Sequence, residues 1–278
     1  MEGLALHVDG WPIRLKWHRL RRRLSDPEFG VDVLAEGFRL GASMEIDLQV
    51  RADGGFALLH DDDLDRETTG HGPVRGQTGA ELTKLSLRGQ GRPPILTEDL
   101  ASMIHAAHPE ALLQFDMKND VVQVGAAGIA HLAAHFSPVS DALIVSGGSE
   151  PLIAALAKAM PGLKKGLDPT DDLLALWPQG LAVVSARLMA TLRHPMRPEM
   201  VYLNWEMLLD AAARDLDMVA LAHAEGVAVD AWTHAMVNPE AGFSDVEWAQ
   251  FSALLKLKPD QITTDSPLAT EAAVQTRA

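Results

Sequence analysis

Residues 111–146 read ALLQFDMKNDVVQVGAAGIAHLAAHFSPVSDALIVS, and this stretch indicates the fold class most clearly. It begins with a short apolar run, residues 111–118, and ends with another, residues 142–146. Between them lies an Ala-rich segment, residues 121–136, whose length and composition favour a helix. Two short buried strands joined by a helix form the repeating unit of a parallel sheet, so the stretch predicts an α/β fold.

The same alternation of strand-like and helix-like stretches extends over most of the chain. Further helices are predicted at residues 97–107, 151–160, 208–225 and 244–257. Strands are predicted at residues 13–18, 43–50, 56–60, 111–118, 142–146, 163–167, 200–205 and 227–233. No G-x-G-x-x-G turn follows the first strand, as an open dinucleotide-binding sheet would require. We therefore expect a (β/α)8 TIM barrel, for which about 250 residues are typical, in a single domain that covers residues 1–278.

The composition is that of a globular protein with a sizeable core, because 47% of the residues are hydrophobic and 22% are charged. The net charge of −14 argues against nucleic acid and anionic membrane surfaces as partners. The N-terminal residues lack the order of a signal peptide, and no stretch reaches roughly 18 apolar residues. We expect a cytoplasmic protein without stable membrane insertion, and the sequence does not indicate its oligomeric state.

The longest stretch without a strand or helix pattern is residues 61–94, which is rich in Gly, Asp, Thr and Arg. It is too long for an ordinary connection between elements of a compact domain. We therefore expect an extended loop segment that lies over the functional site.

Two carboxylates on one predicted strand are the first sign of a metal site. Glu45 and Asp47 are two residues apart, so a strand directs both side chains to one face. Two carboxylates that close raise each other's pKa unless a cation lies between them. The pattern alone leaves equal room for the alternative, in which one of the two faces solvent at the strand end.

Other polar residues at predicted strand ends favour the metal site. His18 ends the first strand, His60 ends the third, and Asp116 with Lys118 ends the fourth. The carboxyl ends of barrel strands meet at the mouth where barrel active sites form, so we expect these side chains to lie together. A single histidine is more often a packed or surface residue, and an acid beside a lysine is more often a salt bridge. The repetition at several strand ends favours the functional interpretation.

The charges of the predicted site suit a phosphodiester. Three carboxylates, one divalent cation, Lys118 and Arg19 leave one positive charge, which one phosphodiester neutralises. Oxygen ligands without cysteine favour Mg²⁺ or Ca²⁺, with Mn²⁺ as a further choice. We expect a small-molecule substrate whose phosphate contacts Arg19 and Lys118, with the two histidines in proton transfer.

The order of these residues resembles the glycerophosphodiester phosphodiesterase family. The family pattern is similar to His18-Arg19, Pro27-Glu28, Glu45-Ile46-Asp47, Asp53-Gly54 and His60-Asp61. It continues in LDRETTG at 64–70, EL at 81–82, ILTEDL at 95–100, AWT at 231–233 and DQITTDSP at 260–267.

The resemblance implies a (β/α)8 barrel that hydrolyses glycerophosphodiesters to sn-glycerol 3-phosphate and an alcohol. It also implies the roles of the site residues. Glu45, Asp47 and the strand-four acid Asp116 would bind the metal. His18 and His60 would act as the general base or nucleophile and the general acid. Apart from these implied roles, Trp232 is a candidate for contact with the substrate.

Three positions depart from the family pattern. Leu20 replaces the usual Gly after His-Arg, so the first loop is expected to follow another path. Phe29 replaces the Asn after Pro-Glu, and Asp116 replaces a longer Glu. We expect Asp116 to reach the metal through a shift of the strand or through a bridging water.

Two other functions remain open from the sequence. The first is phospholipase D-like action on lysophospholipid or sphingolipid head groups, which predicts an apolar groove beside the mouth, with the walls Leu20, Phe29, Trp205 and Trp232. The second is a catalytically weak barrel that binds a phosphorylated ligand, which the departures at Leu20 and Asp116 motivate.

Overall fold

The computed structural model describes residues 1–104 and 107–277, which form two compact units. One unit contains Met1–Asp26 and Lys165–Ala278, and we call it the N/C unit. The other contains Pro27–Lys164, and we call it the central unit.

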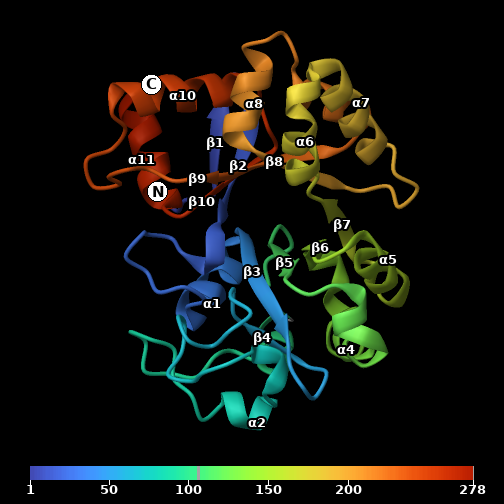
Figure 1. The fold of residues 1–278 in the computed structure, drawn as a ribbon. Coiled ribbons are helices and arrows are strands. Elements are labelled where there is room, and N and C mark those ends of the chain that lie inside the picture. The colour runs from blue at the N-terminus through green and yellow to red at the C-terminus, as the bar shows by residue number, and fades with distance from the viewer. Residues whose placement is uncertain (105–106, 278) are drawn as a thin grey trace. The chain divides into compact units, whose positions relative to one another are not determined.

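The central unit is built on three parallel strands with a hairpin at one edge (Figure 1). The parallel strands are β3 (Ser43–Val50), β5 (Leu112–Met117) and β6 (Leu143–Gly147). Every residue of β3 is buried, as expected for a strand covered on both faces. Its alternate residues Glu45 and Asp47 share one face of the strand, as the sequence predicts.

The predicted third barrel strand is wrong in its direction. Residues 56–60 contribute β4 (Phe56–Leu58), which pairs antiparallel with β3 through Leu48 and Leu58. The short turn at Asp53 and Gly54 explains the difference, because a connection this short can reverse the chain but cannot carry a crossover helix. β4 is therefore a hairpin strand and not one of the parallel strands.

The N/C unit supplies the other parallel strands. They are β2 (Trp11–Trp17), β7 (Lys164–Leu167), β8 (Met200–Asn204), β9 (Ala228–His234) and β10 (Gln261–Thr264). β1 (Ala5–Val8) pairs antiparallel with β2 at the edge. The sequence analysis missed β10 as a strand, although β10 pairs in parallel with both β2 and β9. Within the described residues, β10 replaces residues 56–60 as a parallel strand, so the fold class is the predicted (β/α)8 barrel.

Helices connect the parallel strands. Each predicted helical range contains at least one helix, and five further α-helices among the described residues were not predicted. In the central unit they are α1 (Val31–Leu40), α2 (Gly79–Leu82), α3 (Thr97–Ile104), α4 (Val121–Phe136) and α5 (Glu150–Ala159). In the N/C unit they are α6 (Thr170–Leu176), α7 (Leu181–Leu192), α8 (Trp205–Ala212), α9 (Met218–Ala224), α10 (Asp245–Lys256) and α11 (Pro267–Arg277). Residues 105–106, at the end of the predicted helix 97–107, lie outside the described residues. No helix in the described ranges is long and apolar enough to span a membrane.

Each unit places apolar side chains and polar side chains on opposite faces of its strands. In the N/C unit, Ile13, Leu15 and Ile262 belong to an apolar core that also contains residues of the covering helices. The alternate residues Lys16 and Asp230 are buried and form an ion pair. The strands therefore bury one apolar face against helices and keep a polar face for a site.

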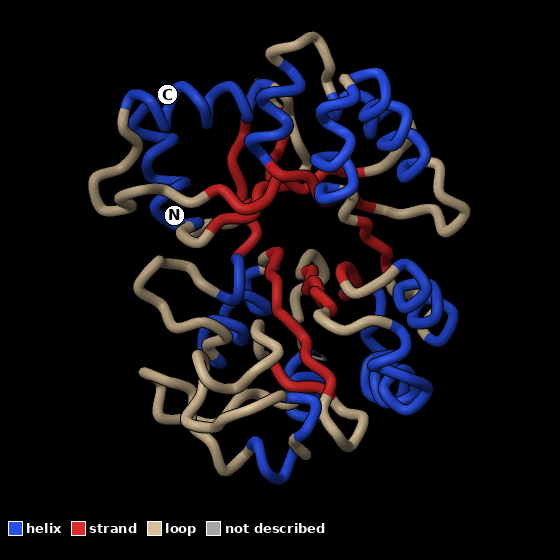
Figure 2. The backbone as a smooth tube through the Cα atoms, viewed as in Figure 1, coloured by secondary structure: helices blue, strands red, loops and turns tan. Residues whose placement is uncertain are grey.

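The predicted loop segment 61–94 has little regular structure, as Figure 2 shows. Its buried side chains nevertheless form a small apolar core. α2 and the 3-10 helix η2 (Val74–Gly76) are its helical elements. Leu64, Val74, Leu82 and Leu87 are buried together with Leu59 in a small apolar cluster. These contacts indicate a packed segment in place of a free loop.

Candidate active site

Three carboxylates of the central unit form the acidic cluster that the sequence predicts. Asp47 of β3 and Asp116 of β5 are register partners, and Glu45 lies on the same face of β3. One carboxylate oxygen from each residue lies within 4.8 Å of the others. Glu45 is 4% exposed and Asp47 is 2% exposed, so these two carboxylates are shielded from water, whereas the Asp116 side chain is 26% exposed.

Lys118 lies against this cluster. Its Nζ atom is 2.6 Å from Oδ1 of Asp47 and 2.5 Å from Oδ2 of Asp116. Burial lowers the pKa of Lys118, but the charges of Asp116 and Asp47 outweigh that effect and raise the pKa overall. The ammonium of Lys118 therefore stays charged. The sequence left open whether Asp116 and Lys118 form a salt bridge or belong to the site, and in the structure both residues form the salt bridge and lie at the acidic cluster.

Two residues at the end of β6 hold Asp116, and the sequence analysis did not identify them. Ser146 Oγ donates a hydrogen bond of 3.1 Å to Oδ1 of Asp116, and it accepts one of 2.7 Å from Nε2 of Gln114. A Cβ atom at Gly147 would lie 2.5 Å from Oδ1 of Asp116. The sequence signal was the Ser-Gly-Gly at the end of a predicted strand, where small residues leave room for a neighbouring functional group.

His60 lies beside β3. It follows β4, which is an antiparallel hairpin strand and not a parallel strand of the barrel. The side-chain amide of Gln49 donates a hydrogen bond of 3.0 Å to the backbone oxygen of His60. The buried carboxylate of Glu67 accepts from the backbone N–H groups of His60 and Asp61, at 3.0 and 2.9 Å to Oε2. Burial raises the pKa of Glu67. These bonds fix the backbone of His60 next to the strand that carries Glu45 and Asp47.

The imidazole of His60 is held by its neighbour in the sequence. Nδ1 of His60 lies 2.8 Å from Oδ1 of Asp61, and Arg66 donates to both carboxylate oxygens of Asp61. The hydrogen bond from Arg66 is the main reason that the pKa of Asp61 is well below its usual range. Asp61 therefore remains an acceptor, which directs Nε2 of His60 away from this pair.

His18 has an equivalent carboxylate in the N/C unit. Nδ1 of His18 lies 2.7 Å from Oδ1 of Asp265, which also accepts a bond of 2.5 Å from Arg21. Burial raises the pKa of Asp265, but the bond and charge of His18 and the charges of Arg21 and Arg19 lower it overall. Asp265 follows β10 directly. Because β10 was not predicted as a strand, Asp265 was not predicted as a residue of the site.

Trp232 and Arg19 also lie in the N/C unit. Trp232 is partly buried on β9, and its Nε1 atom has no hydrogen-bond partner within the described residues. Arg19 lies in the 3-10 helix η1 (His18–Leu20), where its φ of 50° is left-handed. His18, Arg19 and Asp265 thus lie directly after the carboxyl ends of β2 and β10, where barrel enzymes bind their substrates.

The predicted walls of an apolar groove are wrong for two residues. Leu20 is 0% exposed and Phe29 is 1% exposed, so both are packed inside the protein. Trp205 packs with its ring 5.1 Å from that of His234 and lies against the apolar core of the N/C unit. Large apolar side chains are usually buried in the core, and Leu20, Phe29 and Trp205 pack in this way instead of lining a groove.

The acidic cluster fits a divalent metal ion. Its donors are carboxylate oxygens, which hard cations prefer, and three carboxylates outnumber the one ammonium of Lys118. The short Asp116 side chain already brings a ligand atom near those of Glu45 and Asp47, because it is the direct register partner of Asp47.

Residues 27–132 match the model of the glycerophosphoryl diester phosphodiesterase family. A search of curated proteins finds no match to the chain. Among solved structures, one assigned as a glycerophosphoryl diester phosphodiesterase from Silicibacter pomeroyi DSS-3 is 19% identical, with a TM-score of 0.71, covering 99% of this chain and 97% of that one. Another with the same assignment, from Agrobacterium tumefaciens, is 20% identical with a TM-score of 0.69, covering 95% of this chain and 98% of that one. A phosphodiesterase from Oleispira antarctica, in complex with the product sn-glycerol-3-phosphate, is 17% identical with a TM-score of 0.67, covering 95% and 97%.

Proposed function

We propose that the chain hydrolyses a glycerophosphodiester to sn-glycerol 3-phosphate and an alcohol, and the match of residues 27–132 to the model of the glycerophosphoryl diester phosphodiesterase family supports this proposal. The observation that carries the proposal is the acidic cluster of Glu45, Asp47 and Asp116, with Lys118 beside it. The Oleispira antarctica structure with bound sn-glycerol-3-phosphate supports the identity of the product.

The acidic cluster is the proposed metal site. Glu45, Asp47 and Asp116 would hold one divalent cation, Mg²⁺ or Ca²⁺, which when bound neutralises charge on the phosphoryl oxygens. Lys118 adds a fixed positive charge next to it, and the charges on Asp47 and Asp116 keep the ammonium protonated. Arg19 is the second cation assigned to the substrate phosphate, where charge develops in the transition state.

The two histidines are the proposed acid and base. Each has its Nδ1 atom held by an aspartate, His18 by Asp265 and His60 by Asp61. The Nε2 atom of each ring is then the nitrogen that exchanges a proton with the reactants. His18 accepts a proton from water, and the water oxygen forms the new bond to phosphorus. The bond from phosphorus to the alcohol oxygen breaks, and His60 protonates the leaving alkoxide.

Trp232 is the proposed contact for the organic part of the substrate. Its indole N–H can donate one hydrogen bond, and the structure describes no protein acceptor for it. An amphipathic ring at the end of a barrel strand suits a polar, three-carbon glycerol group, because it offers an apolar face together with one donor.

Replacement of either histidine tests the mechanism. We expect His18→Ala and His60→Ala each to lower kcat by about 10²- to 10⁴-fold, because each removes a proton-transfer group. Metal binding measured by isothermal titration should change little, because neither residue belongs to the acidic cluster.

Matched controls exist for both variants. His223 pairs with Asp260 and His71 pairs with Asp65, so each repeats the histidine–aspartate contact outside the proposed site. His223→Ala and His71→Ala should retain turnover. Normal rates in His18→Ala or His60→Ala would refute the assigned roles.

A barrel that merely binds a phosphorylated ligand is the competing function. The position of Asp116 beside Glu45 and Asp47 favours catalysis, because the shorter acid still completes the acidic cluster. Retained binding of sn-glycerol 3-phosphate without metal-dependent turnover of any diester would favour the competing function.

A further inference from the structure

A buried ion pair in the N/C unit takes no part in the proposed mechanism. Nζ of Lys16, on β2, lies 2.7 Å from Oδ2 of Asp230, on β9, and the two side chains are 2% and 0% exposed. The ammonium also lies 4.6 Å from the centre of the Tyr202 ring on β8. In the sheet, β10 lies between β2 and β9. The ion pair therefore connects two strands that the sheet order separates.

The carboxylate of Asp230 also binds the strand that lies between them. Oδ1 of Asp230 accepts a hydrogen bond of 2.6 Å from Oγ1 of Thr263, and Oδ2 accepts one from Nε2 of Gln261. Both donors lie on β10, and each residue is 2% exposed. We call Lys16, Asp230, Gln261 and Thr263 the polar layer. Through the one carboxylate, the polar layer joins β2, β10 and β9.

The polar layer lies directly before the proposed site along each of these strands. Three of its residues precede a site residue by two positions: Lys16 before His18, Asp230 before Trp232, and Thr263 before Asp265. Residues two apart in a strand direct their side chains to the same face. Lys16 and Thr263 are also register partners. The polar layer is thus placed to support the residues that follow it.

The register between β9 and β10 shifts where these strands reach the site. Across the shift, one residue of β10, Thr263, faces two residues of β9, Trp232 and Thr233. An extra residue of this kind is a β-bulge, and bulges next to active sites re-aim a side chain. Because Thr263 bonds to Asp230, the polar layer holds β9 close to the bulge that carries Trp232.

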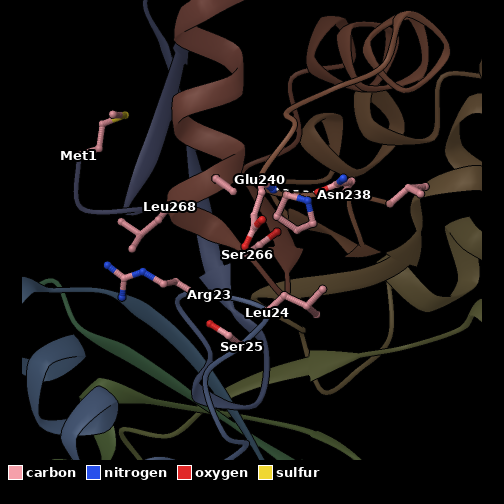
Figure 3. Close-up of a pocket in the computed structure, with 11 residues that line it drawn as sticks. Met1, Arg23, Leu24, Ser25, Asn238, Glu240, Ser266 and Leu268 are labelled. Carbon is pink, nitrogen blue, oxygen red and sulfur yellow. Dashed lines mark hydrogen bonds between the residues drawn. The ribbon is translucent and has the colours of Figure 1, made fainter.

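The space open to ligands lies on the other side of the site residues. A cavity of about 800 Å³ lies where β2, β9 and β10 end (Figure 3). Apart from Met1, the residues that line it belong to the segments that follow these strands, such as Leu24, Asn238 and Ser266. The polar layer is not among the described residues of this lining. A ligand that enters here would reach the site residues first, so the polar layer acts through them.

We propose that Lys16 and Asp230 are positioning residues, whose ion pair fixes the spacing between His18 on one strand and Trp232 on the other. The proposal rests on the proposed function, which assigns a role to each of these two site residues. A buried ion pair is weak evidence for stability, because an uncharged pair of similar volume is often equally stable. Fixing the register of chain segments is the better attested use of buried polar groups.

A double variant separates positioning from stability. Lys16→Met combined with Asp230→Asn removes both charges and keeps the hydrogen bonds. The introduced amide accepts from Thr263 and donates to Oε1 of Gln261, which has no hydrogen-bond partner among the described residues. Each single variant leaves a buried charge unpaired, so we expect its urea midpoint to fall. In the double variant the midpoint should recover.

Turnover should not recover together with stability. With glycerophosphocholine and Mg²⁺, we expect kcat/KM of the double variant to be about 10- to 100-fold below that of the unaltered chain, because small misplacements of reacting groups are costly. The matched control is Lys165→Met with Glu199→Gln, which removes an ion pair of 2.9 Å at β7, outside the polar layer. The control should keep its kcat/KM. Recovery of both the midpoint and kcat/KM in the double variant would overturn the proposal.

A spectroscopic signal of Trp232 tests its position without turnover. In protein labelled with fluorotryptophan, the fluorine resonance of Trp232 is assigned by its loss in Trp232→Phe. We expect this resonance to move in the double variant. The resonances of Trp11 and Trp177 should stay, because these rings contact His223 and Asp210 outside the polar layer. An unmoved Trp232 resonance would overturn the proposal.

Thr263→Val decides the question if the double variant does not fold. It retains the branched shape of the side chain and removes one hydrogen bond to Asp230, so we expect kcat/KM to fall about two- to tenfold and the Trp232 resonance to move. A normal kcat/KM with an unmoved resonance would overturn the proposal. If the resonance moves as expected but the unaltered chain cleaves no diester with metal present, the proposed function fails while the positioning of Trp232 stands.

Discussion

The carboxylate of Asp265 controls how His18 can act, because it holds the Nδ1 atom at 2.7 Å. In Asp265→Asn the side chain loses its charge and can present an N–H group to the ring. We expect kcat to fall about 10- to 100-fold with KM nearly unchanged. This loss is smaller than the roughly 10²- to 10⁴-fold rate increase that general acid–base catalysis supplies, because His18 itself is retained.

Asp260 provides the control for this prediction. It forms a similar pair with His223 at 2.9 Å, but it precedes β10, whereas Asp265 follows β10. Steady-state kinetics of Asp260→Asn should show normal kcat. An equal loss in the two variants would mean that aspartate–histidine pairs here matter for folding alone.

Gly147 is the second residue on which the site depends. Its φ is +70°, and an added Cβ atom would lie 2.5 Å from Asp116 Oδ1 and 2.6 Å from the backbone oxygen of Met117. Gly147→Ala should therefore displace Asp116, weaken metal binding measured by calorimetry, and lower the free energy of unfolding by about 1–3 kcal/mol.

Gly125→Ala separates the displacement of Asp116 from backbone strain. Gly125 also has a positive φ, +60°, but no described atom lies within 4 Å of an added Cβ. We expect this variant to lose stability and to retain metal affinity. Normal metal affinity in Gly147→Ala would contradict the role assigned to Gly147.

The sequence predicts the acidic cluster better than its surroundings. Spacing alone placed Glu45 and Asp47 on one face, because strand geometry makes side chains alternate. Spacing could not reveal Asp265 or Ser146, whose partners are distant in the sequence.

Leu20 and Phe29 adopt left-handed φ values of 57° and 55°, at two positions where the family pattern has Gly and Asn. Both side chains are buried instead of lining a groove.

At the scale of elements, the contact between β9 and α10 carries a pH dependence. His234, at the end of β9, is 2% exposed and lies 4.6 Å, ring to ring, from Phe251 of α10. Burial lowers the pKa of His234 from 6.5 to about 4, against an opposing effect of Glu247.

This shift predicts acid sensitivity of the contact. Between pH 6.5 and about 4 the unfolded chain binds more protons than the folded protein, so the free energy of unfolding falls as the pH decreases. From pH 7 to pH 5 we expect a loss of about 2 kcal/mol from this group in urea unfolding. His234→Phe should remove that part, whereas the exposed His7→Phe should not. An unchanged pH dependence in His234→Phe would contradict the assignment.

Strands and helices were predictable where a local pattern decides them. α4 has the predicted bounds, and Asp120 begins it with a capping box, although Gly125 inside it has a left-handed φ of 60°. The predicted helix 208–225 is divided into α8 and α9, and the left-handed φ of 63° at Asp215 lies between them. β10 was missed because its four residues, Gln-Ile-Thr-Thr, contain a single large apolar side chain. A short strand of this kind is set by its neighbours and not by its own pattern.

At the scale of the whole molecule, the predicted fold class is correct although one of the eight predicted strands was not a barrel strand. The antiparallel β4 was counted and the parallel β10 was not, so two errors cancelled. Residue composition and strand number could therefore predict the class, whereas strand direction depends on connection length.

The net charge of −14 bears on how the proposed reaction works. An anionic diester is repelled by most of the surface, so local positive charge must attract it. In the proposed site, Lys118 and Arg19 would supply part of this charge, and the cation proposed at Glu45, Asp47 and Asp116 would supply the rest. Catalysis should therefore depend strictly on a divalent metal.

The most direct test of the account is release of sn-glycerol 3-phosphate from glycerophosphocholine and related diesters, measured with Mg²⁺ or Ca²⁺ and again with EDTA. We predict turnover with metal, loss of turnover in EDTA and recovery when metal is restored. Turnover that persists in EDTA would contradict the metal site, and the absence of turnover on every diester with metal present would contradict the proposed function.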